Sequence, residues 1–131
     1  MPSATIEICY LYSQEEEVAI MAAVHEAIVE ALKVSPVHRN VTLLAHDPHR
    51  FIGRTDCPNP ERLTNISIYL LPGRSITAKR RLYQALVHKL EKFGIPGSCI
   101  LVRLIELPAE NFAVRGGQAL CDVELGYPVN V

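Results

Sequence analysis

The sequence lacks a marked excess of either charge. Its 13 Lys and Arg residues nearly balance its 14 Asp and Glu residues, which leaves a formal net charge of −1 at pH 7. Proteins that bind nucleic acid or anionic membranes usually carry a strongly basic surface. The composition therefore gives no electrostatic reason to expect nucleic acid or a membrane as a partner.

Several local patterns are also missing. No apolar run reaches the about 18 residues that indicate a membrane-spanning helix. The N-terminus has no basic stretch before an apolar core, so we expect no signal peptide. The sequence shows no glycine-rich phosphate loop, nucleotide-binding fingerprint or convincing Ser-His-Asp arrangement. These absences exclude the common nucleotide-dependent and serine-hydrolase patterns.

The cysteines and histidines form no recognisable metal or redox motif. The four cysteines are widely separated and include no CxxC pair. Cys9 and Cys99 fall in predicted strands and are interpreted as small core residues, and a reducing cytoplasm is the simplest compartment. His46 and His49 flank Asp47-Pro48 but lack a distant partner at ligand spacing. We therefore expect no metal and no cofactor.

The sequence contains two copies of a strand, helix and strand pattern within a single domain of residues 1–131. A chain of this length can bury one core. The first repeat spans 1–48, a proline-rich loop spans 49–63, the second repeat spans 64–108, and a tail spans 109–131. The alternating residues Ile6-Glu7-Ile8 in the first repeat correspond to Ile66-Ser67-Ile68 in the second.

In the first repeat, apolar and polar residues alternate over 5–10, which predicts a half-buried strand. Ser13 and Glu16 then have the spacing of a capping box. A helix is expected from there to about Lys33, because its apolar residues recur at helical spacing. A second strand is expected over 41–45.

The second repeat follows the same plan, with a strand over 66–70, a tight turn at 72–75, a helix to about Phe93 and a strand over 100–106. Two such units predict an α/β fold, a four-stranded mixed sheet with both helices on one face. The strands are apolar on both sides, so we expect oligomerisation to cover the other face. In the tail, Gly116-Gly117 permits a short hairpin.

Four features, in this order, resemble the tautomerase superfamily of 4-oxalocrotonate tautomerase. They are Met1-Pro2 directly before a strand, residues 24–31 of the first helix, Pro72-Gly73-Arg74-Ser75 before the second helix, and Glu110-Asn111-Phe112 before the glycine turn. The resemblance covers essentially the whole chain and is greatest to the longer, malonate semialdehyde decarboxylase-like members. It implies a homotrimer without a cofactor, whose active sites lie near the N-terminal proline and receive residues from adjacent chains.

The family's chemistry points to Pro2. Removal of Met1 would expose a secondary amine, and an α-amino group titrates near ~8. An apolar pocket and nearby arginines would lower that pKa, and a neutral amine is a good general base. With Met1 attached, the Pro2 nitrogen is an amide and cannot act as a base. The structural alternative is that proline only begins a strand.

Three arginines are candidates for binding a small carboxylate substrate. Arg74 begins the second helix, where a guanidinium and the helix N-terminus both favour an anion, and it matches a substrate-binding arginine of the decarboxylase-like relatives. Arg39 also matches a family arginine. Arg115, beside the glycine turn, is interpreted either as reaching a neighbouring active site or as holding the trimer together.

Other positions depart from the decarboxylase-like pattern. His38 stands where those relatives have a catalytic aspartate; it is a candidate for proton transfer or an exposed loop residue. Pro72 replaces one of their arginines. Phe112 and Val114 match positions at which relatives place larger aromatic residues, and they are assigned either to the pocket or to the trimer core.

The sequence therefore predicts keto–enol tautomerisation of a small 2-oxo acid, with Pro2 as the base. Two alternatives remain. One is decarboxylation or dehalogenation of a three-carbon acid, against which the loss of the family aspartate at His38 argues. The other is a catalytically silent trimeric binding or assembly protein, which retention of Met1 would favour.

Overall fold

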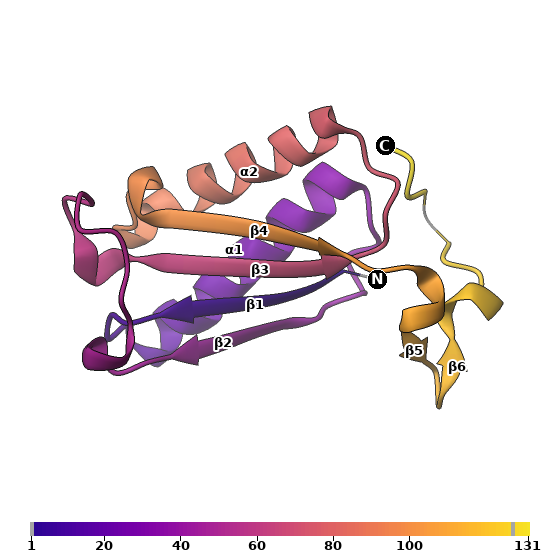
Figure 1. Cartoon of the computed structure of the whole chain (residues 1–131), viewed down its shortest axis with the longest axis horizontal. Helices are drawn as coiled ribbons and strands as arrows, with labels where there is room; N and C mark the ends of the chain where they lie inside the picture. Colours follow the sequence, from indigo (N-terminus) through magenta and orange to yellow (C-terminus); the bar gives the residue numbers. More distant parts are fainter. Residues whose placement is uncertain (1, 127) are drawn as a thin grey trace.

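The computed structural model describes residues 2–126 and 128–131, and it contains the two predicted βαβ units (Figure 1). Both expected helices and all four expected strands are present, with ends that differ from the predictions by a few residues. The elements are β1 (Ser3–Ile8), α1 (Gln14–Leu32), β2 (Val41–Ala45), β3 (Thr64–Leu70), α2 (Ile76–Leu90) and β4 (Ile100–Glu106).

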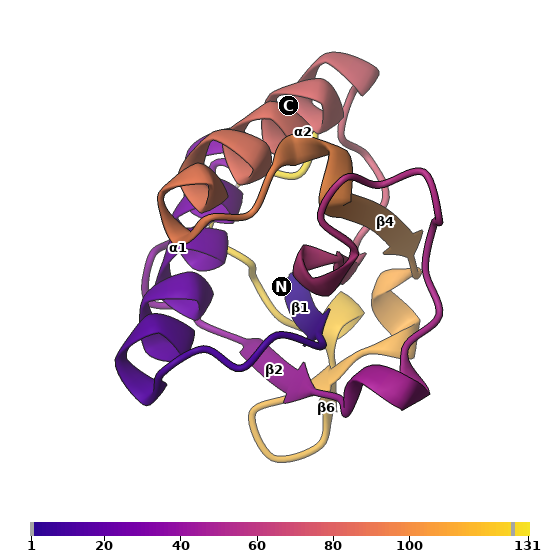
Figure 2. The same cartoon turned by 90° about the vertical axis from the view of Figure 1, so that its left-hand side faces the viewer.

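The four strands form one mixed sheet in the order β2-β1-β3-β4. The central strands β1 and β3 are antiparallel, and each is parallel to the second strand of its own repeat. Both helices lie on the same face of this sheet, as Figure 2 shows from the side. The predicted fold class is therefore confirmed.

Side-chain caps explain where the two helices begin. At α1, the Ser13 hydroxyl accepts a hydrogen bond from the Glu16 N–H, and the Glu16 carboxylate accepts one from the Ser13 N–H. At α2, the Ser75 hydroxyl accepts from the Ala78 N–H. These bonds satisfy backbone donors that a helix end otherwise leaves free. The capping box predicted from sequence is confirmed.

The core lies between the helices and the covered face of the sheet. Every second residue of β1 and β3 is buried, so the alternation seen in the sequence is a true division between two faces. The buried leucines of α2 belong to the same core as the buried side chains of β1 and β3. The largest fully buried side chains include Ile6, Ile8, Ile66, Ile68, Leu82 and Leu86.

The uncovered face of the sheet differs from the sequence expectation. Along the two central strands it is polar, because the register places Thr5 opposite Ser67 and Glu7 opposite Asn65. Exposed apolar side chains on this face include Leu101 on the edge strand β4, which is 51% exposed, and Tyr69 near the end of β3. The expectation of apolar strands on both sides is therefore wrong for the centre of the sheet, because period-two alternation puts its polar residues there.

The loop between the repeats is attached to the second repeat. A disulfide joins Cys57 to Cys99, and both cysteines are buried. Cys99 lies in a short turn before β4 and Cys9 lies after β1, so the prediction that both are strand residues is wrong. Arg62, at the end of the loop, stacks over the Tyr10 ring at 3.6 Å.

The tail forms the predicted hairpin, from β5 (Ala113–Val114) and β6 (Gln118–Ala119). Its turn uses Arg115, Gly116 and Gly117, all with positive φ. Two glycines make that left-handed turn accessible. Within the part of the chain that the structure describes, no helix is long and apolar enough to cross a membrane.

Candidate active site

Four segments meet at the end of the sheet where β1 begins. Because β1 is parallel to β2 and antiparallel to β3, the starts of β1 and β2 lie beside the end of β3. The Ala4 N–H donates to the Asn40 carbonyl at 2.9 Å, and the Leu107 N–H donates to the Leu70 carbonyl at 2.9 Å. Pro2, the segment before β2, the turn after β3 and the tail therefore gather at one end (Figure 1).

Pro2 immediately precedes β1 and is buried. The strand pairing extends to Ser3, which lies opposite Tyr69 near the end of β3. Because Ser3 is already paired, the position of Pro2 at the start of β1 is fixed by the sheet. The predicted candidate base thus lies in a protected position rather than at a frayed end.

Arg74 lies in the turn that leads from β3 into α2. Its side chain is 5% exposed, and its Nη1 donates to the Leu71 carbonyl at 3.2 Å. The preceding Gly73 has φ +126, a conformation that favours glycine. The turn therefore places a buried cation at the N-terminal end of α2, where the helix dipole also favours an anion.

The last residues of the chain lie over this turn. The Ser75 hydroxyl, while capping α2, donates to the Val131 carbonyl at 3.0 Å. A Cβ added to Gly73 would come within 2.8 Å of the Asn130 side-chain oxygen. The tail therefore closes over the arginine turn, and glycine at position 73 allows that approach.

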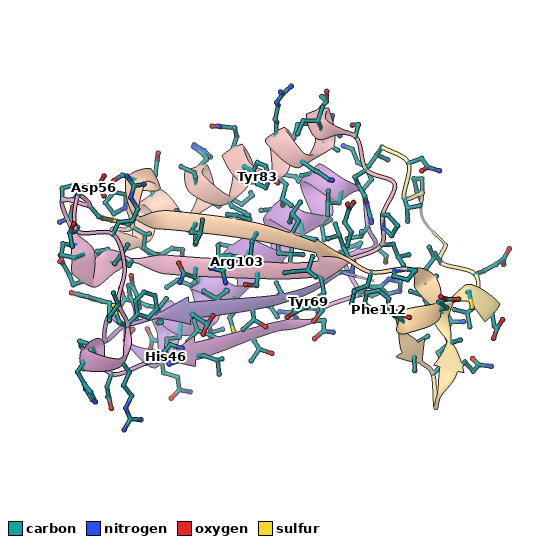
Figure 3. All side chains as sticks on the ribbon, in the orientation of Figure 1. His46, Asp56, Tyr69, Tyr83, Arg103 and Phe112 are labelled. Atoms are coloured by element: carbon teal, nitrogen blue, oxygen red, sulfur yellow. A yellow bond between two sulfur atoms is a disulfide. The ribbon has the colours of Figure 1, made fainter. Side chains whose placement is uncertain are left out.

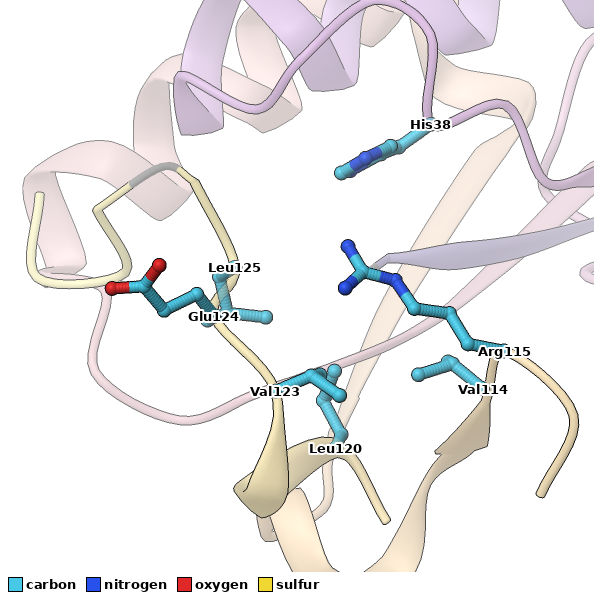
Figure 4. A pocket seen from close by; sticks show the side chains of 7 residues that line it. All are labelled: His38, Val114, Arg115, Leu120, Val123, Glu124 and Leu125. Carbon is cyan, nitrogen blue, oxygen red and sulfur yellow. The ribbon is translucent and has the colours of Figure 1, made fainter. Parts of the chain in front are cut away.

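A small pocket of about 60 Å³ lies between the tail and the segment before β2. His38 and Arg115 point toward one another across it, and Glu124 lies further along the tail (Figure 4). The structure thus brings together three of the residues singled out from sequence: His38, Arg115 and Val114. Leu120, Val123, Glu124 and Leu125 complete the lining.

The other predicted residues are placed differently. Arg39 is exposed and lines a separate hollow of about 250 Å³ with Val18, Met21, His25 and Val41. Within one chain the structure therefore does not bring Arg39 to the pocket that holds its neighbour His38. Phe112 is half-buried at the base of the hairpin, where its carbonyl accepts from the Leu120 N–H at 2.8 Å.

Sequence reasoning missed the second half of the tail as pocket lining. In the sequence, only the alternation of Val123 and Leu125 with polar residues pointed to this segment. Such a short alternation does not show which surface the two apolar side chains contact. Among residues 2–126 and 128–131, no group of three or more His, Cys, Asp and Glu side chains could hold a metal ion. His46 instead contacts Glu7 at 2.9 Å on the uncovered sheet face.

These features describe a double βαβ protein in which buried Pro2, buried Arg74 and the tail lie at one end of the sheet, beside a pocket that neither Pro2 nor Arg74 lines. Residues 38–115 match the family described as tautomerase enzyme, and the chain belongs to that family. A search of curated proteins found no match.

Solved structures share the fold over nearly the whole chain. FG41 malonate semialdehyde decarboxylase inhibited by 3-bromopropiolate is 28% identical, with a TM-score of 0.85, over 96% of this chain and 99% of that one. A second malonate semialdehyde decarboxylase, studied for decarboxylase and hydratase activities, is 21% identical, with a TM-score of 0.81, over 92% and 96%. A fused 4-OT described as an asymmetric trimer is 19% identical, with a TM-score of 0.79, over 92% and 97%.

Proposed function

We propose that this chain is a tautomerase that needs no cofactor and moves a proton between carbon and oxygen in a small 2-oxo acid. Pro2 is the base once Met1 has been removed. The observation that carries the proposal is the meeting, at one end of the sheet, of buried Pro2, buried Arg74 and the pocket between His38 and Arg115. A proton-transfer site for an anion needs such a combination of base and cations.

The surroundings of Pro2 favour a neutral amine. Burial penalises the protonated form, and cationic arginines at the same end of the sheet penalise it further. The neutral nitrogen takes the proton from the carbon next to the carbonyl. The C–H electron pair then forms the new C=C bond, and the C=O π pair moves onto oxygen. The protonated amine then gives its proton to that oxygen, which yields the enol and restores the base.

The charges divide into two roles. Arg74 holds the substrate carboxylate through two parallel N–H···O bonds, with the N-terminus of α2 behind it. Arg115 stabilises the negative charge that develops on the carbonyl oxygen. His38, across the pocket from Arg115, relays the returning proton: its imidazole accepts a proton from the Pro2 ammonium on one nitrogen and releases one to the substrate oxygen from the other. Val114 with Phe112 forms the apolar wall.

Arg39 fits this scheme only in an assembly. It lies away from the His38–Arg115 pocket of its own chain, so a role in binding substrate requires a neighbouring copy. Fused 4-OT structures are described as trimers, which supports a homotrimer here. The exposed Leu44 at the β2 edge of the uncovered sheet face offers apolar contact area for such an assembly.

Decarboxylation or hydration of a three-carbon acid is the second candidate. The 28% identity to FG41 malonate semialdehyde decarboxylase over 96% of the chain favours it. Two features favour tautomerisation instead: His38 stands where the decarboxylase-like pattern has an aspartate, and Pro72 stands where it has an arginine. In the decarboxylase mechanism Pro2 would be protonated and would polarise the carbonyl.

The test compares processed wild type with Pro2→Ala in two reactions: ketonisation of a 2-oxo acid enol, followed by its ultraviolet absorbance, and decarboxylation of malonate semialdehyde, followed by release of carbon dioxide. We expect enol turnover in the wild type and at least a 100-fold loss in Pro2→Ala. Exposed Pro36→Ala is the matched control.

The outcomes separate the three functions. Faster decarboxylation than ketonisation supports the second candidate. Absence of both reactions in a trimer that lacks Met1 supports a binding protein. Unchanged ketonisation in Pro2→Ala contradicts the proposed base.

A further inference from the structure

A second, larger pocket lies at the opposite end of the sheet, where β3 and β4 begin. We refer to it as the loop pocket. It has a volume of about 260 Å³, against about 60 Å³ for the pocket beside His38. The loop between the repeats forms one wall, seen at the end of the molecule that carries Asp56 in Figure 3. Its lining consists of residues 51–54, Leu63, Asn65, residues 98–101 and Arg103.

The internal repeat explains why a pocket forms there. The loop follows β2 in the first repeat as the tail follows β4 in the second, so the loop pocket is the counterpart of the proposed active site. The correspondence of Ile6 with Ile66 places Arg62 at the position equivalent to Pro2. Arg62 is an internal residue that stacks over Tyr10 and donates to the Phe93 carbonyl at 3.1 Å. Within the described residues, the loop pocket therefore has no counterpart of the Pro2 amine at this position.

The lining combines apolar walls with two cations. Phe51, Ile52, Leu63, Ile100 and Leu101 supply the apolar surface, and Arg54 and Arg103 supply the charge. Among the described residues that line it, none is acidic. An apolar cavity with a few converging polar groups is the usual form of a small-molecule site.

The two arginines are held in different ways. Arg54 makes two hydrogen bonds to the exposed Asp56 carboxylate, at 2.9 and 2.7 Å. Arg103 donates from Nη1 to the Ser67 hydroxyl at 3.4 Å. A guanidinium carries five N–H donors, of which Ser67 takes one. Arg103, on the uncovered face of the sheet (Figure 3), is therefore the better anchor for an anion.

The walls are fixed before any ligand arrives. The Cys57–Cys99 disulfide ties the loop to the turn before β4, and Cys99 itself lines the pocket. Gly53 packs so closely on Leu63 that an added Cβ would collide with the leucine side chain. A preformed pocket binds more tightly, because less conformational freedom is lost on binding.

We propose that the loop pocket binds a small monocarboxylate with an apolar body, a single ring or a branched chain, and does not transform it. The carboxylate bonds to Arg103 and the apolar body lies against Phe51, Leu63 and Leu101. The size agrees with this ligand class: a cavity of about 150 Å³ already holds benzene, and pockets for drug-sized ligands begin at about 300 Å³.

The test measures binding of 3-phenylpropanoate to the full chain by calorimetry, with neutral 3-phenylpropanamide as the control ligand. We expect Arg103→Gln to weaken carboxylate binding at least tenfold and to leave amide binding nearly unchanged. Arg80→Gln, which removes an exposed arginine from α2, is the matched control and leaves both unchanged. Ser98→Phe, which fills the pocket from its rim, abolishes binding of both ligands.

Arg74→Ala separates this site from the proposed active site. Binding that survives Arg74→Ala and is lost in Arg103→Gln supports the proposal, whatever the enzymatic activity of either variant. Binding that is lost in Arg74→Ala and unaffected by Arg103→Gln overturns it, because the carboxylate then occupies the Pro2 end. Absence of measurable binding to the wild type at millimolar ligand also overturns it. Thermal unfolding of each variant identifies any loss that is due to misfolding.

Discussion

Replacement of Arg74 by alanine removes the proposed carboxylate anchor from the turn before α2. The guanidinium is 5% exposed and is held by its bond to the Leu71 carbonyl, so its geometry is set before substrate binds. A hydrogen bond to a charged group contributes about 1.5–3 kcal/mol. Loss of one such bond at the lower end of this range, about 1.5 kcal/mol, lowers kcat/KM about tenfold. Loss of two such bonds, about 3 kcal/mol together, lowers it about 150-fold.

The assay compares the enol of a 2-oxo acid with the enol of its methyl ester. We expect Arg74→Ala to lower kcat/KM by about 10- to 150-fold for the acid and far less for the ester, because the ester carries no anion to anchor. Arg74→Lys keeps the charge but loses the planar fork, so it restores activity only in part.

Controls keep this comparison interpretable. Arg80→Ala removes an exposed arginine from the same helix and leaves both rates unchanged. Thermal unfolding of Arg74→Ala shows whether the buried turn still folds. Equal losses for acid and ester, or no loss for either, refute the assignment of Arg74 as the carboxylate anchor.

Two further predictions concern stability. Ser13→Ala removes the cap of α1 and lowers the free energy of unfolding by about 0.5–2 kcal/mol, measured by urea denaturation; a value near zero contradicts the role given to the capping box. Burial raises the pKa of Tyr12 from its ordinary 10.0, and nearby Arg62 opposes that shift only in part. Because the folded state then holds the phenol proton more tightly than the unfolded chain, the free energy of unfolding falls as the pH rises above about 10. Tyr12→Phe makes that fall shallower in denaturation measured from pH 8 to 11; an unchanged slope contradicts the reasoning.

The fold was predictable because its signals are local and repeated. The alternation around Ile6 and Ile66 identified two equivalent strands, and the Ser13–Glu16 spacing located the first helix. The turn at Gly116-Gly117 located the hairpin. Each signal depends on residues close in sequence, and the structure forms the corresponding elements.

The site was predictable only in part. The resemblance singled out His38, Val114 and Arg115, which line one pocket. The closeness of Cys57 to Cys99 was not predictable, because sequence gives no distance between a loop and a turn so far along the chain. The polar centre of the uncovered sheet face was also missed. The number of apolar residues in a strand does not say which face each one occupies, whereas the register of β1 with β3 does.

The central claim depends on the peptide bond between Met1 and Pro2. The most direct measurement prepares the chain in two forms, with Met1 removed and with Met1 retained, verifies each by intact mass, and compares their rates of enol ketonisation. The proposal predicts turnover by the processed form and at least a 100-fold lower rate in the form that retains Met1, because an amide nitrogen is not a base and general-base catalysis contributes about 10²–10⁴-fold. Equal rates in the two forms would contradict Pro2 as the catalytic base.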